Sequence, residues 1–293
     1  ALMSPCLTNM FLLPLIQELD DSSLGSRVHG HHVPVVAYAD DLLVMSSGAQ
    51  NLQTMLDTVS NFSVSWRLEF VHPNPSLTKS HCFIFGAELL AMLPSWRLCG
   101  QSLAVRCETE HLGVQLRSQL QGTDHVNARI RRGRGAFFGL MPTGMFNANL
   151  LAIDKAYLWR SVVSPAMLYG CSTCLLRSSD ISRLESWQAT SIKYALRLPR
   201  VAHHTAMLAA LQIPSVQDVL RRSVFVAFRD IFRDEHRLRS VIKSSLTKEA
   251  SQTHTDTAGS TGSLVSHMMS LCGGKLETLL EVAGGHLSHE LVS

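Results

Sequence analysis

The sequence predicts an α+β fold, in which antiparallel strands packed with helices are followed by an all-helical region. Short β-branched runs separated by proline and glycine are confined to residues 1–120, whereas segments of helical period fill residues 121–243. Residues 244–293 are rich in Ser, Thr and Gly, which is typical of a disordered tail. We therefore expect three parts with these boundaries.

The first part is expected to open with a helix and to continue with a hairpin. Ser4 and Pro5 suit the N-cap and the first helical position, and apolar residues follow at helical spacing. Residues 33–46 hold two short apolar runs about a two-residue polar break, which predicts an antiparallel hairpin. Three later segments complete this part: a helix over 52–62, a strand at 82–85, and two or three short strands within 96–116.

The second part is expected to contain only helices. Five segments favour helix, and proline interrupts the chain between several of them: 124–141, 148–163, 180–197, 203–211 and 215–240. The last segment is the most clearly amphipathic. Its apolar face carries Leu220, Val224, Phe228 and Ile231, and its opposite face carries Arg222, Arg229, Arg233 and Arg237.

Composition favours a globular chain, for which we expect no membrane span. The 293 residues are 46% hydrophobic and 17% charged, which is ample for a core. The sequence holds no apolar run of about 18 residues and no leader with a cleavage site. Its seven scattered cysteines indicate reduced thiols, so we expect a cytoplasmic or nuclear protein that is not secreted. Because the chain begins at Ala1 inside an apparent element, we interpret it as a fragment.

Charge is distributed unevenly along the chain. Residues 1–120 hold six basic and ten acidic residues, a net of −4, whereas residues 121–243 hold 18 and eight, a net of +10. Residues 244–293 return to −3. A strongly basic middle part favours a polyanion, most economically nucleic acid, although a solvated helical surface rich in arginine is the alternative.

Two adjacent carboxylates stand between two apolar runs. Asp40 and Asp41 follow Val33–Ala39 and precede Leu42–Met45, so they lie at the expected hairpin tip. Carboxylate oxygens suit Mg²⁺, which shares its remaining positions with water and with substrate phosphates. The alternative is an ordinary turn, because Asp is a favoured turn residue.

The motif at this tip resembles one from a known family. Tyr38-Ala39-Asp40-Asp41 within a hairpin is similar to the signature of reverse transcriptases, in particular those of non-LTR (LINE-like) retrotransposons. Further stretches resemble the family in the expected order, so that the resemblance covers about residues 1–240. These stretches are Ala1–Asn9, Asn74–Ser80, His111–Val114, Arg129–Leu140, Ala156–Thr173, Leu184–Arg200 and Ala206–Val216.

The resemblance implies an architecture, a reaction and partners. Residues 1–120 would be the later part of a polymerase palm, and residues 121–243 a thumb-like connection. The family's enzymes are RNA-directed DNA polymerases that use two Mg²⁺ ions (or Mn²⁺). The implied partners are an RNA template, a DNA primer and deoxynucleoside triphosphates, with no membrane. The sequence does not indicate an oligomeric state.

Roles for individual residues also follow from the resemblance. Asp40 and Asp41 would be catalytic metal ligands, with Asp40 the stronger. Tyr38 would lie beside the primer end; its alternative is a buried strand aromatic. The helix start at Ser4 and Pro5 would contact template and incoming nucleotide. Lys79 would approach the departing pyrophosphate, although the longer spacing around it equally favours a solvent-facing loop lysine.

Four arginines follow the last expected strand. Because the guanidinium fork suits phosphate, they are candidates for backbone contacts that position a duplex without reading its sequence. They are Arg129, Arg131, Arg132 and Arg134.

One catalytic element of the family is absent from the sequence. A further metal-binding aspartate comes from a strand that would precede Ala1, so we predict that this chain alone does not extend a primer. Two alternatives remain open. One is a non-catalytic nucleic-acid-binding remnant, and the other is an unrelated α+β domain whose Asp pair is only a turn.

Overall fold

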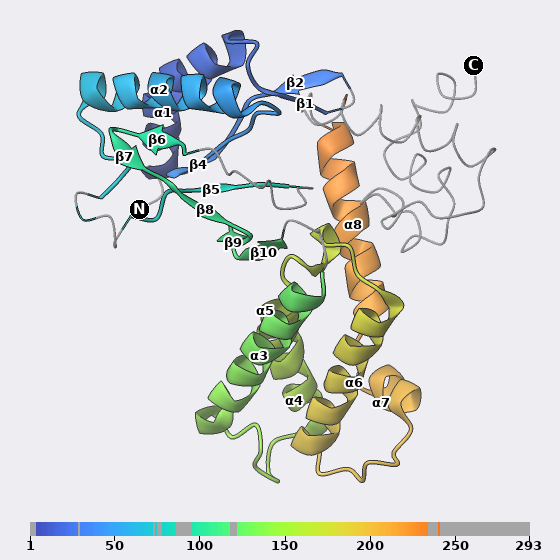
Figure 1. Cartoon of the computed structure of the whole chain (residues 1–293). Coiled ribbons are helices and arrows are strands. Elements are labelled where there is room, and N and C mark those ends of the chain that lie inside the picture. The colour runs from blue at the N-terminus through green and yellow to red at the C-terminus, as the bar shows by residue number, and fades with distance from the viewer. Residues whose placement is uncertain are drawn as a thin grey trace, which may run out of the picture. The chain divides into compact units, whose positions relative to one another are not determined.

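The protein is described by a computed structural model that covers residues 4–28, 30–72, 74, 78–85, 95–117, 122–233 and 240. The chain divides into two compact units, Ala1–Glu108 and Thr109–Ser293 (Figure 1). The compact units meet between residues 108 and 109, and the three-part organisation with boundaries after residues 120 and 243 stays a prediction. The expected tail, residues 244–293, and Arg237 lie outside the described residues.

The first unit contains two long helices and several short strand pairs. Its elements in order are α1 (Ser4–Asp21), β1 (Ser26–Val28), β2 (His31–Val33), β3 (Val35–Tyr38), β4 (Asp41–Val44), α2 (Ala49–Trp66), β5 (His81–Phe83), β6 (Arg97–Leu98), β7 (Gln101–Ser102) and β8 (Ala104–Arg106). The pairs β1–β2, β3–β4 and β6–β7 are antiparallel, and β5–β8 is parallel. The α+β fold class with antiparallel strands is thereby confirmed.

The core of the first unit lies between the two helices and the strands. Leu15 and Leu19 of α1 and Met55 of α2 are fully buried in one apolar cluster that also includes Val35 of β3. Trp96 closes this core, and its indole Nε1 donates a 2.9 Å hydrogen bond to the carbonyl of Ala49 at the start of α2. The strands that carry the candidate site are therefore supported by helices.

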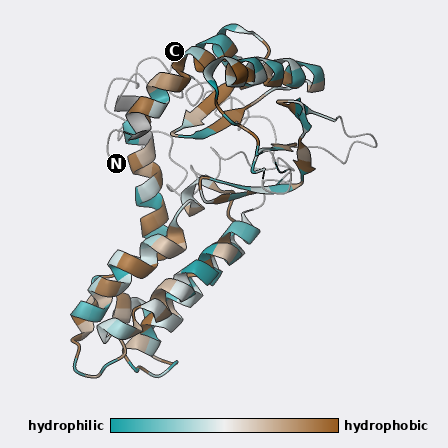
Figure 2. Ribbon diagram, turned by 90° about the vertical axis from the view of Figure 1, so that its left-hand side faces the viewer, coloured by the Kyte–Doolittle hydropathy of each residue, from teal (hydrophilic) through white to brown (hydrophobic). Residues whose placement is uncertain are grey.

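The second unit begins with a hairpin and is otherwise helical among its described residues. Its elements are β9 (Glu108–His111), β10 (Val114–Arg117), α3 (Thr123–Gly139), η2 (Met141–Thr143), α4 (Ala152–Leu158), η3 (Trp159–Val163), α5 (Ser164–Leu168), η4 (Cys171–Thr173), α6 (Ser178–Ala195), α7 (His204–Ala210) and α8 (Val216–Arg233). Residues 96–116 thus hold five short strands, where the sequence predicts two or three. All five predicted helical segments contain helix, and hydrophilic and hydrophobic residues are interspersed along the described helices (Figure 2).

A proline explains why the predicted helix over 148–163 does not form as one regular α-helix: the segment holds α4 and η3, and α5 follows after it. Pro165 has no N–H and its ring crowds the carbonyl four residues earlier, so a regular α-helix cannot pass through it. The chain widens instead into the π-helix η3, where the Ser164 N–H bonds to the carbonyl of Trp159. Within the described residues no helix is both long enough and apolar enough to span a lipid bilayer.

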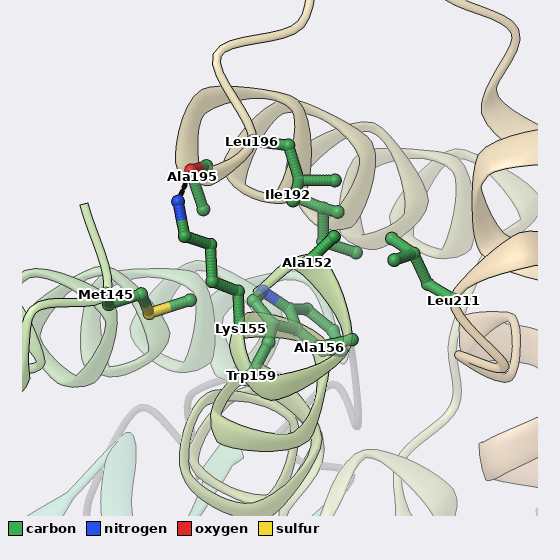
Figure 3. Close-up of a pocket in the computed structure, with 9 residues that line it drawn as sticks. All are labelled: Met145, Ala152, Lys155, Ala156, Trp159, Ile192, Ala195, Leu196 and Leu211. Atoms are coloured by element: carbon green, nitrogen blue, oxygen red, sulfur yellow. Dashed lines mark hydrogen bonds between the residues drawn. The ribbon is translucent and has the colours of Figure 1, made fainter. Parts of the chain in front are cut away.

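A buried lysine joins two helices of this unit. Lys155 of α4 is 6% exposed, and its Nζ donates a 2.9 Å hydrogen bond to the carbonyl of Ala195, the last residue of α6 (Figure 3). The last carbonyls of a helix lack helical partners and carry partial negative charge, so a cation is favourable there. Next to it, Trp159 Nε1 donates a 3.0 Å hydrogen bond to Ser191 Oγ of α6.

Substitution of Lys155 is expected to destabilise the second unit. Lys155→Met keeps the length of the side chain and leaves the Ala195 carbonyl buried without its donor, so we expect unfolding to become easier by about 1–2 kcal/mol. Chemical denaturation monitored by tryptophan fluorescence measures this. The matched control is Lys193→Met, because Lys193 Nζ donates to the carbonyl of Arg200 in an exposed setting, and it should change stability by under about 0.5 kcal/mol. Equal effects of the two variants would contradict a structural role for Lys155.

Candidate functional site

The acidic pair lies at the tip of the β3–β4 hairpin. Tyr38 pairs with Asp41, so that only Ala39 and Asp40 form the turn and Asp41 is the first residue of β4. Ala39 has a φ of +51°, in the left-handed region that a non-glycine residue rarely adopts. Such a conformation costs about 1–2 kcal/mol, which indicates a turn held by its surroundings.

The two faces of this hairpin differ in exposure. Val35 is buried at 8% exposure, whereas Val36 and Tyr38 are 43% and 65% exposed. Residues directly opposite each other in an antiparallel pair share a face, so the Tyr38 ring and the Asp41 side chain emerge on the same exposed face. The alternative of a buried strand aromatic at Tyr38 is therefore wrong.

The tip offers oxygen ligands for a divalent cation. Asp40 and Asp41 are both exposed, and Mg²⁺ is typically bound through one or two carboxylates while waters and phosphate oxygens complete its octahedron. The residue types therefore fit Mg²⁺ or Mn²⁺. Among the described residues no group of three or more His, Cys, Asp or Glu side chains gathers, so this pair alone would hold the ion weakly.

The remaining candidates of the first unit are only partly described. Lys79 is exposed, which agrees both with a contact to pyrophosphate and with a solvent-facing loop lysine. The predicted helix is present, but α1 begins at Ser4 and not at Pro5, and the side chains of Ser4 and Pro5 lie outside the described residues.

The four arginines of α3 have different surroundings. Arg129 is 5% exposed; its Nη2 donates a hydrogen bond to the Gly113 carbonyl, and its guanidinium lies 4.6 Å from the centre of the Tyr169 ring. Burial gives Arg129 a structural contact instead of the expected phosphate contact. Sequence spacing could not separate it from its neighbours, because only the packing of α3 decides which arginine faces inward.

The other three arginines remain on the surface. Arg132 pairs with Glu110 of β9 at 2.7 Å, and this hydrogen bond lowers the pKa of the Glu110 carboxyl. Arg131 and Arg134 are exposed, and their side chains make no hydrogen bond or ion pair within the part of the chain that the structure describes. Two guanidinium groups are thus free for an anionic partner, and a third is shared with a carboxylate.

A buried histidine fixes the base of α3 to the rest of its unit. His125 is 1% exposed; its Nδ1 accepts a hydrogen bond from the Gln115 N–H at 3.2 Å, and its Nε2 lies 3.0 Å from the Tyr169 carbonyl. This pattern assigns the proton to Nε2. Burial lowers the pKa of His125. The sequence pattern does not single out His125 or Tyr169 as site residues.

Glycine is required where this histidine packs. Gly170 has a φ of +71°, and a Cβ there would lie 2.8 Å from Val114 Cγ2 and 3.1 Å from His125 Nε2. The contacts of His125, Arg129 and Tyr169 thus tie the β9–β10 hairpin to α3 and to the end of α5, which sets the orientation of the arginines on α3.

Part of the first unit is similar in sequence to a known protein family. Residues 1–83 match the model of the reverse transcriptase (RNA-dependent DNA polymerase) family. The matched residues include α1, the β3–β4 hairpin with both aspartates, α2 and β5. A search of curated proteins finds no match.

Protonation of His125 is expected to weaken the second unit. The folded-state pKa lies below the ordinary value of 6.5, so the unfolded chain binds the proton first. The stabilisation is complete above about pH 6.5 and is lost as the pH falls below it. Thermal unfolding between about pH 7 and pH 5.5 should show a falling Tm for the wild type and a flatter profile for His125→Gln.

Two other groups define the controls for this measurement. The pKa of Glu110 is also lowered, but from 4.5, so its contribution is lost only at more acidic pH. Burial also lowers the pKa of His204. The variant His204→Gln therefore measures how much of the fall in Tm comes from protonation of His204. Identical pH profiles for wild type and His125→Gln would contradict the role of His125.

Proposed function

We propose that this chain is part of an RNA-directed DNA polymerase of the non-LTR retrotransposon class. The observation that carries the proposal is the Tyr38–Asp41 hairpin tip, with a strained turn and two exposed carboxylates, inside the region that matches the reverse transcriptase family. An ordinary turn would explain the aspartates but not the coincidence of the motif, the hairpin and the family match.

The hairpin tip would act at the 3′ end of a DNA primer. Asp40 and Asp41 would hold Mg²⁺ or Mn²⁺, which when bound activates the attacking oxygen and stabilises the leaving oxygen of nucleotidyl transfer. The Tyr38 ring shares a face with Asp41 and would pack against the terminal nucleotide. Ser4 and Pro5 remain candidates for template and nucleotide contacts, and Lys79 for the pyrophosphate.

The second unit would hold the primer–template duplex. Arg131 and Arg134 are unpaired and exposed, so each can donate a fork of hydrogen bonds to a phosphate. Arg132 can join them at the expense of its bond to Glu110. Arg129 does not belong to this surface, because its side chain is buried. Such contacts neutralise backbone charge and do not read base sequence.

We further propose that residues 1–293 by themselves bind nucleic acid without extending a primer. Phosphoryl transfer depends on ions and substrates held in line, and an exposed pair of carboxylates gives little such orientation. The second candidate function, a non-catalytic nucleic-acid-binding protein, shares the same basic surface but requires no ion at Asp40.

Binding to an RNA–DNA heteroduplex should depend on salt through two arginines. The double variant Arg131→Gln/Arg134→Gln should lower the slope of log affinity against log salt by about 2, because each lost phosphate contact removes about one released counterion. Fluorescence anisotropy over a salt series measures this. Arg97→Gln/Arg106→Gln, with exposed arginines of the first unit, is the matched control. An unchanged slope in the first variant would contradict the proposed surface.

Primer extension tests the proposed absence of turnover. On oligo(dT) annealed to poly(rA), with Mg²⁺ or Mn²⁺, the wild-type chain should incorporate no more labelled nucleotide than its Asp40→Asn variant. Extension by the wild type alone would overturn the inactivity proposal and would at the same time establish Asp40 as catalytic. Extension by both proteins would point to a contaminating polymerase. Purification would then be repeated until the Asp40→Asn variant shows no extension.

A further inference from the structure

Helices α3 and α6 run side by side in the same direction. At one end Arg183 of α6 donates a hydrogen bond to Asn127 Oδ1 of α3, and at the other end the rings of Phe138 and Tyr194 meet at 6.2 Å. Both contacts join residues 56 positions apart, so the two helices keep one register between these contacts.

Eight side chains flank the line where these helices meet, which we name the α3–α6 seam. Spacing of i, i+4, i+7 and i+11 places residues on one face of a helix, and this spacing recurs on both helices. The seam residues are Asn127, Arg131, Arg134 and Phe138 of α3, and Arg183, Trp187, Thr190 and Tyr194 of α6.

The seam carries positive charge without carboxylates. Three of its residues are arginines, none is acidic, and the stretch 125–139 contains no Asp or Glu. The acidic residues of α6 lie elsewhere: Asp180 is 1% exposed and accepts hydrogen bonds from Thr123 and from the Arg177 N–H, and Glu185 faces His204 near α7. Arg183 lies 3.8 Å from Asp180, but its side chain is 46% exposed.

Aromatic rings crowd the other end of the seam. Phe138 is 50% exposed and Tyr194 is 62% exposed. Phe146 lies 6.2 Å from the Phe138 ring and 5.7 Å from the Tyr194 ring, and buried Phe137 contacts all three. The exposed rings are therefore held in place by one another, which reduces the entropy lost when a ligand packs against them.

We propose that the α3–α6 seam binds single-stranded nucleic acid, with its arginines on the phosphates and the rings of Phe138 and Tyr194 against the bases. Positively charged grooves combined with aromatic platforms are the general means of binding single strands, because every base offers a flat face. The inference extends the proposed function, which requires only phosphate contacts to a duplex.

The chemistry of the seam favours a single strand over a duplex. Bases in a duplex are already stacked and cannot lie on protein rings without unpairing. Eleven positions separate Asn127 from Phe138, which at 1.5 Å per residue is about 16 Å, enough for a short run of nucleotides. A second protein would have to match three arginines and an aromatic cluster together, whereas a polynucleotide supplies anion and ring in every unit.

Binding by the full chain separates stacking from charge. The probes are a 20-nucleotide oligo(dT) and an abasic oligonucleotide of the same length, which keeps the phosphates and lacks the bases. The variant Phe138→Ala/Tyr194→Ala should bind oligo(dT) about tenfold more weakly and the abasic strand less than about twofold more weakly. Tyr194→Phe keeps the ring and should bind as the wild type does.

Control variants identify the other outcomes. Tyr157→Ala removes a ring that is 64% exposed on α4 and should leave both affinities unchanged. Equal losses for both probes, or none, would overturn the stacking inference. If duplex binding still depends on Arg131 and Arg134 in that case, the proposed function survives alone. A wild-type chain that self-associates, together with an aromatic variant that stays monomeric and still binds oligo(dT), would overturn the inference in favour of a protein interface.

Discussion

Burial of one face of the β3–β4 hairpin against the helices determines the arrangement of the acidic site. Because Val35 lies in the core with Leu15 and Met55, the period-two alternation of a strand forces Tyr38 outward and carries its partner Asp41 with it. A shift of one residue in the register of β4 against β3 would turn the Asp41 carboxylate towards the core and the apolar side chains of β4 towards solvent. The strained Ala39 turn is stable only because the paired strands on both sides are held by this core.

In the second unit, burial of one face of α3 likewise decides which of its arginines are exposed. The contacts of Arg129 with Gly113 and Tyr169 fix one face of the helix inward, so Arg131 and Arg134 must face outward. Arg132 lies next to Glu110, which neutralises part of the surface. The net charge of residues 121–243 therefore overstates what is available to a polyanion, and the free guanidinium groups concentrate near the seam with α6.

Sequence reasoning predicted the elements better than it predicted their surroundings. The hairpin at 33–46 and the five helical segments follow from periodicity and turn residues, which are local properties. Five strands within 96–116 exceeded the prediction because strands of two or three residues leave too short a pattern. The burial of Arg129, the buried cation Lys155 and the exposed rings of Phe138 and Tyr194 depend on which helix faces touch, and that information is not local in the chain.

The most direct test of the account is whether the hairpin tip binds a divalent ion. Titration of the chain with Mn²⁺, followed by water proton relaxation, should show a saturable enhancement that Asp40→Asn removes. The matched variant Asp57→Asn alters a carboxylate on α2 that accepts a hydrogen bond from Gln53, and it should bind as the wild type does. An enhancement that Asp40→Asn leaves unchanged would show that the ion binds elsewhere and would contradict the assignment of the aspartate pair as metal ligands.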